Sequence, residues 1–296
     1  MNLFEILDKK TETFNQDKNI PAYLYGAFRR KSISFFNGLT DEKTIVYWFQ
    51  SQSFTIDLRL KHATETLPIE CQAWIGDTLW DSTHELLSWN VTKEANYQNH
   101  IQWPEPAKVH AIGNCILEFS PSNAYVEDWR QQANQGLFLG LRLTHATHVE
   151  SQGKINLHGG LIICDQFIAY AQSRLPDIQR QINAHTDLKK AYKMGITSDQ
   201  ISSFEVSIGF DGQLKALSTQ CDQIGKKFNF ENFEILDEHH LTQTILINGE
   251  SYRLNYQIDT FIKNQIFQNQ TLTPQESQEW FKTEQNHLLH QSKITR

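Results

Sequence analysis

The sequence predicts a mostly β protein made of two tandem antiparallel β-barrels. Short apolar or alternating runs recur along most of the chain, and polar turn pairs such as Asn248-Gly249 separate them. No long helical pattern interrupts the first half. About eight such runs precede residue 132, and a comparable set follows it. Eight antiparallel strands close into a barrel that can hold one small ligand, and closure removes exposed strand edges.

We expect a first barrel over residues 20–132, a second barrel over residues 133–262 and a helical tail over residues 263–296. Gly76-Asp77 and Gly113-Asn114 are predicted turns, because glycine tolerates a positive φ. The predicted strands of the first half are Ala22–Phe36, a hairpin over Tyr47–Leu60, Cys71–Ile75, Thr78–Ser82, Glu85–Thr92, Val109–Ile112, Cys115–Ser120 and Ala124–Arg130.

The second half alternates strands with one inserted helix. Pro176-Asp177 opens a helical pattern over about 178–194, and Gly195 provides its stop. The predicted strands are Leu137–His145, Lys154–His158, Leu161–Cys164, Phe167–Gln172, Phe204–Phe210, Gln213–Thr219, Phe228–Leu236, Leu241–Ile247 and Ser251–Ile258.

A second helix is predicted over about 274–291, because Thr273-Pro274-Gln275-Glu276 is a capping box with proline at the first helical position. Trp280, Phe281, Leu288 and Leu289 would give this helix an apolar face that docks onto a barrel.

Composition narrows the class of protein. The net charge of −7 and the scattered lysines and arginines argue against nucleic-acid binding. Arg29-Arg30-Lys31 is the only basic run, and we interpret it as a solvated strand edge. The N-terminus lacks the pattern of a signal peptide, and no apolar run approaches the length of a membrane span. Four widely spaced cysteines fit buried free thiols, so we expect a cytoplasmic protein with no membrane partner.

The stretch Tyr47–Leu60 carries the first candidate site. Its second strand alternates, so that Asp57 and Arg59 share one face while Phe54, Ile56 and Leu58 share the other. An inward Asp–Arg pair would be desolvated and would suggest a binding or catalytic role. The same alternation is equally compatible with an outward surface pair worth at most about 1 kcal/mol, and we slightly favour this outward arrangement.

The full candidate set combines aromatic walls with a few polar groups, as small-molecule pockets do. The expected ligand-binding residues are Trp48, Gln50, Arg59, Trp89, Glu127 and Trp129, and the expected catalytic residues are His84, Glu85 and Asp57. The tryptophans would also be explained by a filled core without any ligand. Histidine spacing does not bring ligands together, so no metal is expected, and the common nucleotide, hydrolase and zinc-protease motifs are missing.

Several segments together resemble a family of uncharacterised bacterial proteins. VYWFQSQSFTIDLRL is similar to their YWLQ … ADLR pattern. The other similar segments are WNVTKEANYQNHIQWPEP, YVEDWR, GLIICDQFIAYAQSRLP and FEVSIGF … LSTQ. The architecture also resembles the calycin (lipocalin-like) superfamily, which includes a yeast two-barrel protein of unknown role. This resemblance implies lipocalin-like barrels and small-ligand binding, without a set of catalytic residues.

Three functional hypotheses follow. The first is binding of a small hydrophobic or aromatic molecule inside a barrel. The second is a cofactor-independent enzyme, of the oxygenase, isomerase or cyclase type, that uses His84, Glu85, Asp57 or Glu127 as acid or base and Arg59 to hold an anion. The third is an interaction protein with filled barrels. No cofactor is expected, and a homodimer is compatible with the sequence.

Overall fold

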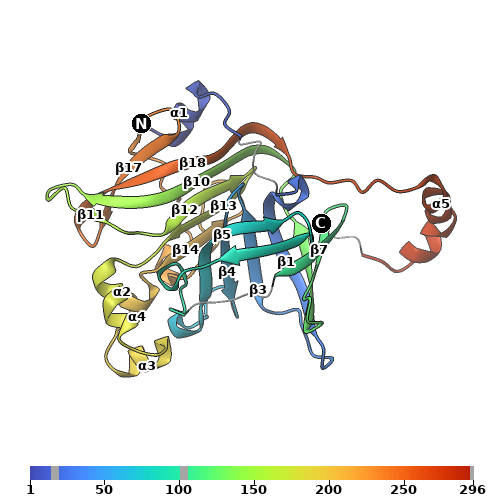
Figure 1. The fold of residues 1–296 in the computed structure, drawn as a ribbon, viewed down its shortest axis with the longest axis horizontal. Helices are drawn as coiled ribbons and strands as arrows, with labels where there is room; N and C mark the ends of the chain where they lie inside the picture. The colour runs from blue at the N-terminus through green and yellow to red at the C-terminus, as the bar shows by residue number, and fades with distance from the viewer. Residues whose placement is uncertain (15–19, 101–105, 294–296) are drawn as a thin grey trace.

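The computed structural model describes residues 1–14, 20–100 and 106–293. Two β-sheets dominate it, and Figure 1 shows the sheet of the first half lying against the sheet of the second half. The prediction of a mostly β protein is confirmed. Within the described residues, no helix has both the length and the apolar content that crossing a membrane requires.

The first half forms a closed antiparallel barrel of eight strands. β9 pairs back onto β1 and completes the ring, while the two-residue strand β2 extends the far end of β1. The strands are β1 (Gly26–Phe35), β2 (Thr40–Asp41), β3 (Ile45–Gln50), β4 (Phe54–Leu60), β5 (Gln72–Asp81), β6 (Leu86–Asn90), β7 (Ala107–Ile112), β8 (Cys115–Phe119) and β9 (Tyr125–Gln131). The first predicted barrel is therefore confirmed as a barrel.

One predicted turn of this barrel is wrong. Gly76 and Asp77 lie inside the continuous strand β5. Gly76 is needed there for space, since a Cβ would come within 2.8 Å of Val91 and 3.1 Å of the Trp74 ring. The glycine therefore marks a close approach between neighbouring segments of the barrel. The sequence pattern cannot distinguish such a glycine from a turn glycine.

The second half forms an open sheet in the order β15-β14-β13-β12-β10-β18-β17-β16, with β11 beside β10. No pairing among the described residues joins β15 to β16, so the second predicted barrel is not closed. Both edge strands are short, which leaves little backbone for closure. The strands are β10 (Gln135–His148), β11 (Lys154–Ile155), β12 (Gly159–Cys164), β13 (Phe167–Gln172), β14 (Glu205–Gly209), β15 (Leu217–Ser218), β16 (Phe233–Ile235), β17 (His240–Ile247) and β18 (Glu250–Ile266).

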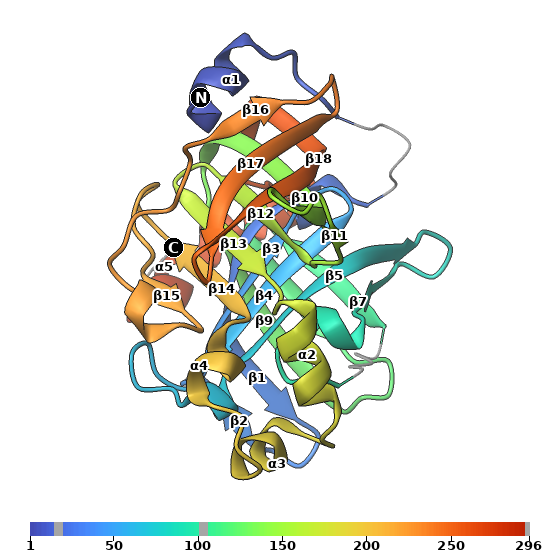
Figure 2. The same cartoon turned by 90° about the vertical axis from the view of Figure 1, so that its left-hand side faces the viewer.

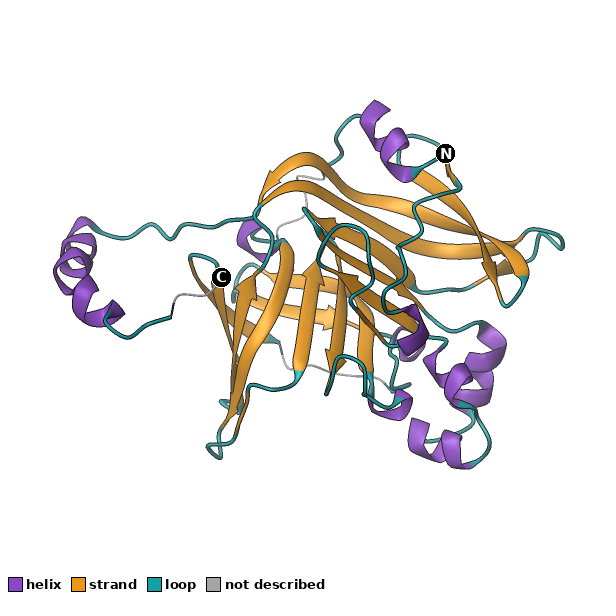
Figure 3. Cartoon of the chain, turned by 180° about the vertical axis from the view of Figure 1, so that it is seen from behind, coloured by secondary structure: helices purple, strands orange, loops and turns teal. Residues whose placement is uncertain are grey.

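The described residues form five α-helices, which lie outside the two sheets (Figures 2 and 3). α1 (Leu3–Lys9) covers one face of the second sheet with its apolar side chains. The inserted helix predicted over 178–194 is instead two helices, α2 (Pro176–Asn183) and α3 (Leu188–Lys193), and the short α4 (Ser198–Ser202) follows them. The break comes where the Asp187 side chain caps α3 by accepting a hydrogen bond from the Lys190 amide at 2.8 Å.

The C-terminal helix α5 (Gln275–Leu289) forms where the sequence predicts it, but it does not dock. Figure 1 shows it standing apart from both sheets at the end of an extended segment. None of its residues is buried, and Trp280 remains 59% exposed. The predicted docking through its apolar face is therefore wrong for the chain in this structure.

β4 is buried on both faces, and this decides which side chains enter the barrel. Phe54, Ile56 and Leu58 point outward, and they share one apolar cluster with residues of β12, β13 and β14. Thr55, Asp57 and Arg59 consequently point into the barrel. The second sheet thus supplies the burial that an outward apolar strand face needs.

Polar contacts fix the second sheet to the turn between β3 and β4. The Asp259 carboxylate on β18 accepts hydrogen bonds from the Ser51 hydroxyl at 2.6 Å, the Ser53 amide at 2.8 Å and the Ser53 hydroxyl. Nearby, the Arg142 guanidinium pairs with Asp77 at 3.1 Å and lies over the Phe54 ring. Charge-assisted bonds of this kind fix the position of one sheet relative to the other.

Gly140 on β10 allows this close approach. A Cβ there would lie 1.9 Å from the Ser51 hydroxyl oxygen, whose own bond to Asp259 restricts its movement. We expect Gly140→Ala to lower the free energy of unfolding by about 1–3 kcal/mol in urea denaturation, as overpacking does. Gly153→Ala in an exposed turn is the control, with an expected change within about 0.5 kcal/mol. Equal stability of the two variants would contradict the tight contact.

Candidate functional site

A cavity of about 420 Å³ occupies the inside of the first barrel. We call it the barrel cavity. Its walls combine four tryptophans with two arginines and four carboxyl groups. The lining residues are Arg30, Ile33, Phe35, Asp41, Trp48, Asp57, Arg59, Trp74, Trp89, Glu118, Tyr125, Glu127 and Trp129. Alternation on each strand explains the set, because every second side chain of a closed barrel points inward.

The tryptophan rings form a contiguous aromatic wall. The Trp48 ring stacks on Phe28 at 4.9 Å between centroids and meets the edges of Trp89 and Trp129 at 5.8 and 5.6 Å. Trp74 continues the wall beside Trp89. These offset and edge-to-face arrangements are the favourable ones for aromatic rings.

A polar cluster beneath this wall holds two of the indoles in place. The Gln50 side-chain oxygen accepts hydrogen bonds from the Trp48 indole at 3.2 Å and from the Thr55 hydroxyl at 2.5 Å. The Trp89 indole donates to Thr55 Oγ1 at 3.1 Å, and the Gln50 amide donates to Thr78 at 2.8 Å. Gln50 therefore positions the wall and does not line the cavity, unlike the ligand contact predicted for it.

Two ion-pair groups cross the cavity. The Arg30 guanidinium donates to Glu127 at 2.7 Å and to Asp41 at 2.9 Å. The Arg59 guanidinium donates to both oxygens of Asp57, at 2.9 and 3.4 Å. Bidentate pairing of this kind fixes geometry as well as charge.

Both findings on the arginines correct expectations from the sequence. The slightly favoured outward orientation of Asp57 and Arg59 is wrong, because the second sheet covers the apolar face of β4. The interpretation of Arg29-Arg30-Lys31 as a solvated edge is wrong for Arg30, which is 8% exposed and enters the cavity.

Glu118 on β8 is a cavity residue that the sequence analysis missed. It lies directly across from Glu127 on β9 and is 4% exposed. Its carboxyl accepts hydrogen bonds from the Trp129 indole at 2.9 Å and the Tyr125 hydroxyl at 3.4 Å. Burial, and then the neighbouring Glu127 carboxylate, raise the pKa of Glu118 to about 8. At neutral pH Glu118 is therefore mostly protonated.

Six of the predicted residues meet in this cavity: Trp48, Asp57, Arg59, Trp89, Glu127 and Trp129. His84 and Glu85 do not. Both are exposed in the turn between β5 and β6, where Glu85 has a φ of 52° and His84 pairs with Asp81 at 2.7 Å. The predicted strand Glu85–Thr92 begins only at Leu86, so Glu85 and the preceding His84 belong to the turn and lie outside the barrel interior.

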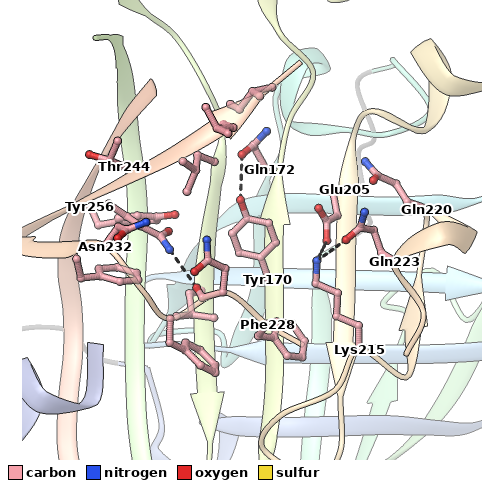
Figure 4. A pocket seen from close by; sticks show the side chains of 18 of the residues that line it. Tyr170, Gln172, Glu205, Lys215, Gln220, Gln223, Phe228, Asn232, Thr244 and Tyr256 are labelled. Atoms are coloured by element: carbon pink, nitrogen blue, oxygen red, sulfur yellow. Dashed lines mark hydrogen bonds and ion pairs between the residues drawn. The ribbon is translucent and has the colours of Figure 1, made fainter. Parts of the chain in front are cut away.

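A larger hollow of about 770 Å³ lies on the second sheet (Figure 4). Amide side chains and aromatic rings line it. Lys215 is the only buried cation among the described residues that line it, and it pairs with Glu205 at 2.7 Å and donates to Gln223 at 3.0 Å. The charges of this hollow are thus matched within the protein, and none of the sequence-predicted site residues lines it.

The described residues contain no group of three or more histidine, cysteine, aspartate or glutamate side chains arranged to hold a metal ion. The four cysteines are free. Cys71 and Cys164 are buried as predicted, whereas Cys115 is half-buried and Cys221 is exposed. Comparisons with protein-family models, curated proteins and solved structures found no match to the chain.

Proposed function

We propose that the first barrel binds a small aromatic molecule in the barrel cavity. The observation that supports this most directly is an aromatic-walled cavity of about 420 Å³ inside a closed barrel, with two arginines and four carboxyl groups beside the rings. Rings held by hydrogen bonds at their edges offer their faces without further ordering, which lowers the entropic cost of binding. The relationship to calycin-like bacterial proteins stays a prediction that agrees with this proposal.

Titration with indole tests the proposal, with calorimetry as the readout. Trp74→Leu is the preferred cavity variant, because the Trp74 indole has no hydrogen-bond partner among the described residues. We expect it to weaken indole binding roughly three- to tenfold, the contribution of one aromatic contact. Trp280→Leu on the exposed helix α5 is the matched control and should bind as the parent does.

Circular dichroism and thermal unfolding of both variants separate lost binding from lost folding. If the folded parent binds neither indole nor other small aromatics at millimolar concentration, the binding proposal is wrong. The filled-barrel interaction protein would then be the better hypothesis for this half of the chain.

A cofactor-independent enzyme is the second candidate, and Glu118 is the observation that favours it. A carboxyl group with a pKa near 8 in a buried aromatic site has the properties of a general acid. In this version Glu118 replaces the exposed His84 and Glu85 in the catalytic role. For a substrate found by screening, turnover of Glu118→Gln would fall more than substrate affinity if the protein is an enzyme.

A further inference from the structure

The charges that face the barrel cavity are unequal in number. Four carboxyl groups, those of Asp41, Asp57, Glu118 and Glu127, face two guanidinium groups, those of Arg30 and Arg59. The adjacent strand β7 does not restore the balance, because Lys108 and His110 are exposed on its other face. The described part of the cavity therefore has an excess of acidic groups.

Both guanidiniums are already matched by carboxylates of the protein. Arg30 bridges Glu127 and Asp41, and Arg59 forms two bonds to Asp57. An anionic ligand would have to displace one of these carboxylates, which would then remain buried and unpaired at a high cost. The cavity therefore disfavours the anion that was expected at Arg59.

Glu118 is the carboxyl group left without a cation. No basic side chain of the described residues lies within ion-pairing distance of it, and its two hydrogen-bond donors, Trp129 and Tyr125, are both neutral. Its place beside the aromatic wall puts a carboxyl group next to aromatic faces. A ligand cation next to Glu118 would gain an ion pair and the favourable interaction of a cation with aromatic faces.

We infer that the ligand of the barrel cavity is an arylalkylamine, whose alkylammonium group pairs with Glu118 while its aromatic ring lies among the tryptophans. This inference rests on the proposed binding function and specifies the class of ligand.

Binding of an ammonium ion at this position must be coupled to proton release. In the free protein the Glu118 carboxyl is mostly protonated at pH 7, because Glu127 and burial outweigh the more distant attraction of Arg59. Pairing with the ligand requires the carboxylate, so the carboxyl proton leaves to the buffer while the ammonium keeps its own protons. Binding of the ammonium ion at pH 7 should therefore release a proton.

Three probes of similar shape test the inference on the intact chain: tryptamine as the cation, indole as the neutral molecule and indole-3-acetate as the anion. Calorimetry at pH 7 in phosphate and in Tris measures affinity and proton release together. We expect tryptamine to bind at least tenfold more tightly than indole and to release about one proton, whereas indole releases none.

Glu118→Gln should reduce the ratio of tryptamine to indole affinity to near one and should abolish proton release. Glu42→Gln, in the exposed turn after β2, is the control and should keep the parent ratio. If Glu118→Gln fails to fold, the pH dependence of binding to the parent protein tests the inference. Its tryptamine affinity should rise at least tenfold from pH 6 to pH 8 while its indole affinity stays constant.

The outcomes test the proposed binding function and the inferred class of ligand separately. If indole binds but tryptamine binds no better, or indole-3-acetate binds most tightly, the inference is wrong and the proposed function stands. If tryptamine binding is tight but unaffected by Glu118→Gln, the assignment to Glu118 is wrong. If none of the probes binds, both the proposed function and the inference fail.

Discussion

The free energy of unfolding is expected to fall by a few kcal/mol, on the order of 3, between roughly pH 5 and pH 8 because of the buried Glu118. The folded protein raises the pKa of this carboxyl from 4.5 to about 8. Between these values the folded state keeps a proton that the unfolded state has released. Since the folded state then binds more protons, stability is fully present below about pH 4.5 and declines as the pH rises to about 8.

Glu118→Gln should remove this contribution. The variant keeps an oxygen that accepts from the Trp129 indole and never ionises. Urea denaturation at several pH values should therefore show a flatter profile for the variant, which exceeds the parent in stability at pH 8. Most other titrating groups are common to both proteins, so the difference reports Glu118 together with its interaction with Glu127. Parallel profiles would show that Glu118 is ionised normally in the folded state.

Arg30→Met is expected to lower the free energy of unfolding by about 3–5 kcal/mol, the largest effect among the substitutions considered. The guanidinium bridges Glu127, which is equally buried, and Asp41 at the half-exposed edge of the cavity. Its removal leaves the Glu127 carboxylate buried without a cation. The cost comes mainly from that unpaired charge and only partly from the lost pair.

The double variant Arg30→Met with Glu127→Gln provides the decisive comparison. It should recover a large part of the lost stability, because the buried charge has been removed with its partner. Arg180→Met is the surface control, since both members of the Arg180–Asp177 pair are mostly exposed, and it should change stability by less than about 0.5 kcal/mol. Purely additive losses in the double variant would contradict this account.

Much of the strand pattern follows from the sequence alone. Turn pairs such as Asn248-Gly249 and Gly113-Asn114 lie between strands as predicted, because local backbone preferences determine such hairpins. Closure of the first barrel follows from its run of consecutive antiparallel strands. Failure of the second set to close depends on the lengths of its edge strands, which local patterns do not specify.

The positions of the cavity residues likewise follow only in part from the sequence. Alternation places Trp48 with Gln50 and Asp57 with Arg59 on common faces, but it cannot say which face is inside. That choice depends on the second sheet, which covers the opposite face of β4. Glu118 becomes visible only through its register with Glu127, because a single acidic residue in the strand Cys115–Phe119 is equally compatible with a solvent-facing position.

The burial of β4 on its outer side has a consequence for how this barrel can change. In a barrel whose only core is its interior, enlarging the interior removes the packing that stabilises the strands. Here the outer faces of β3 and β4 share an apolar cluster with the second sheet, so a large part of the stabilising burial lies outside the ring. Uncharged cavity positions such as Ile33 and Phe35 therefore contribute a smaller share of the burial that stabilises the barrel. Because the second sheet stabilises the barrel from outside, substitutions at these cavity positions can change the ligand specificity without loss of the fold.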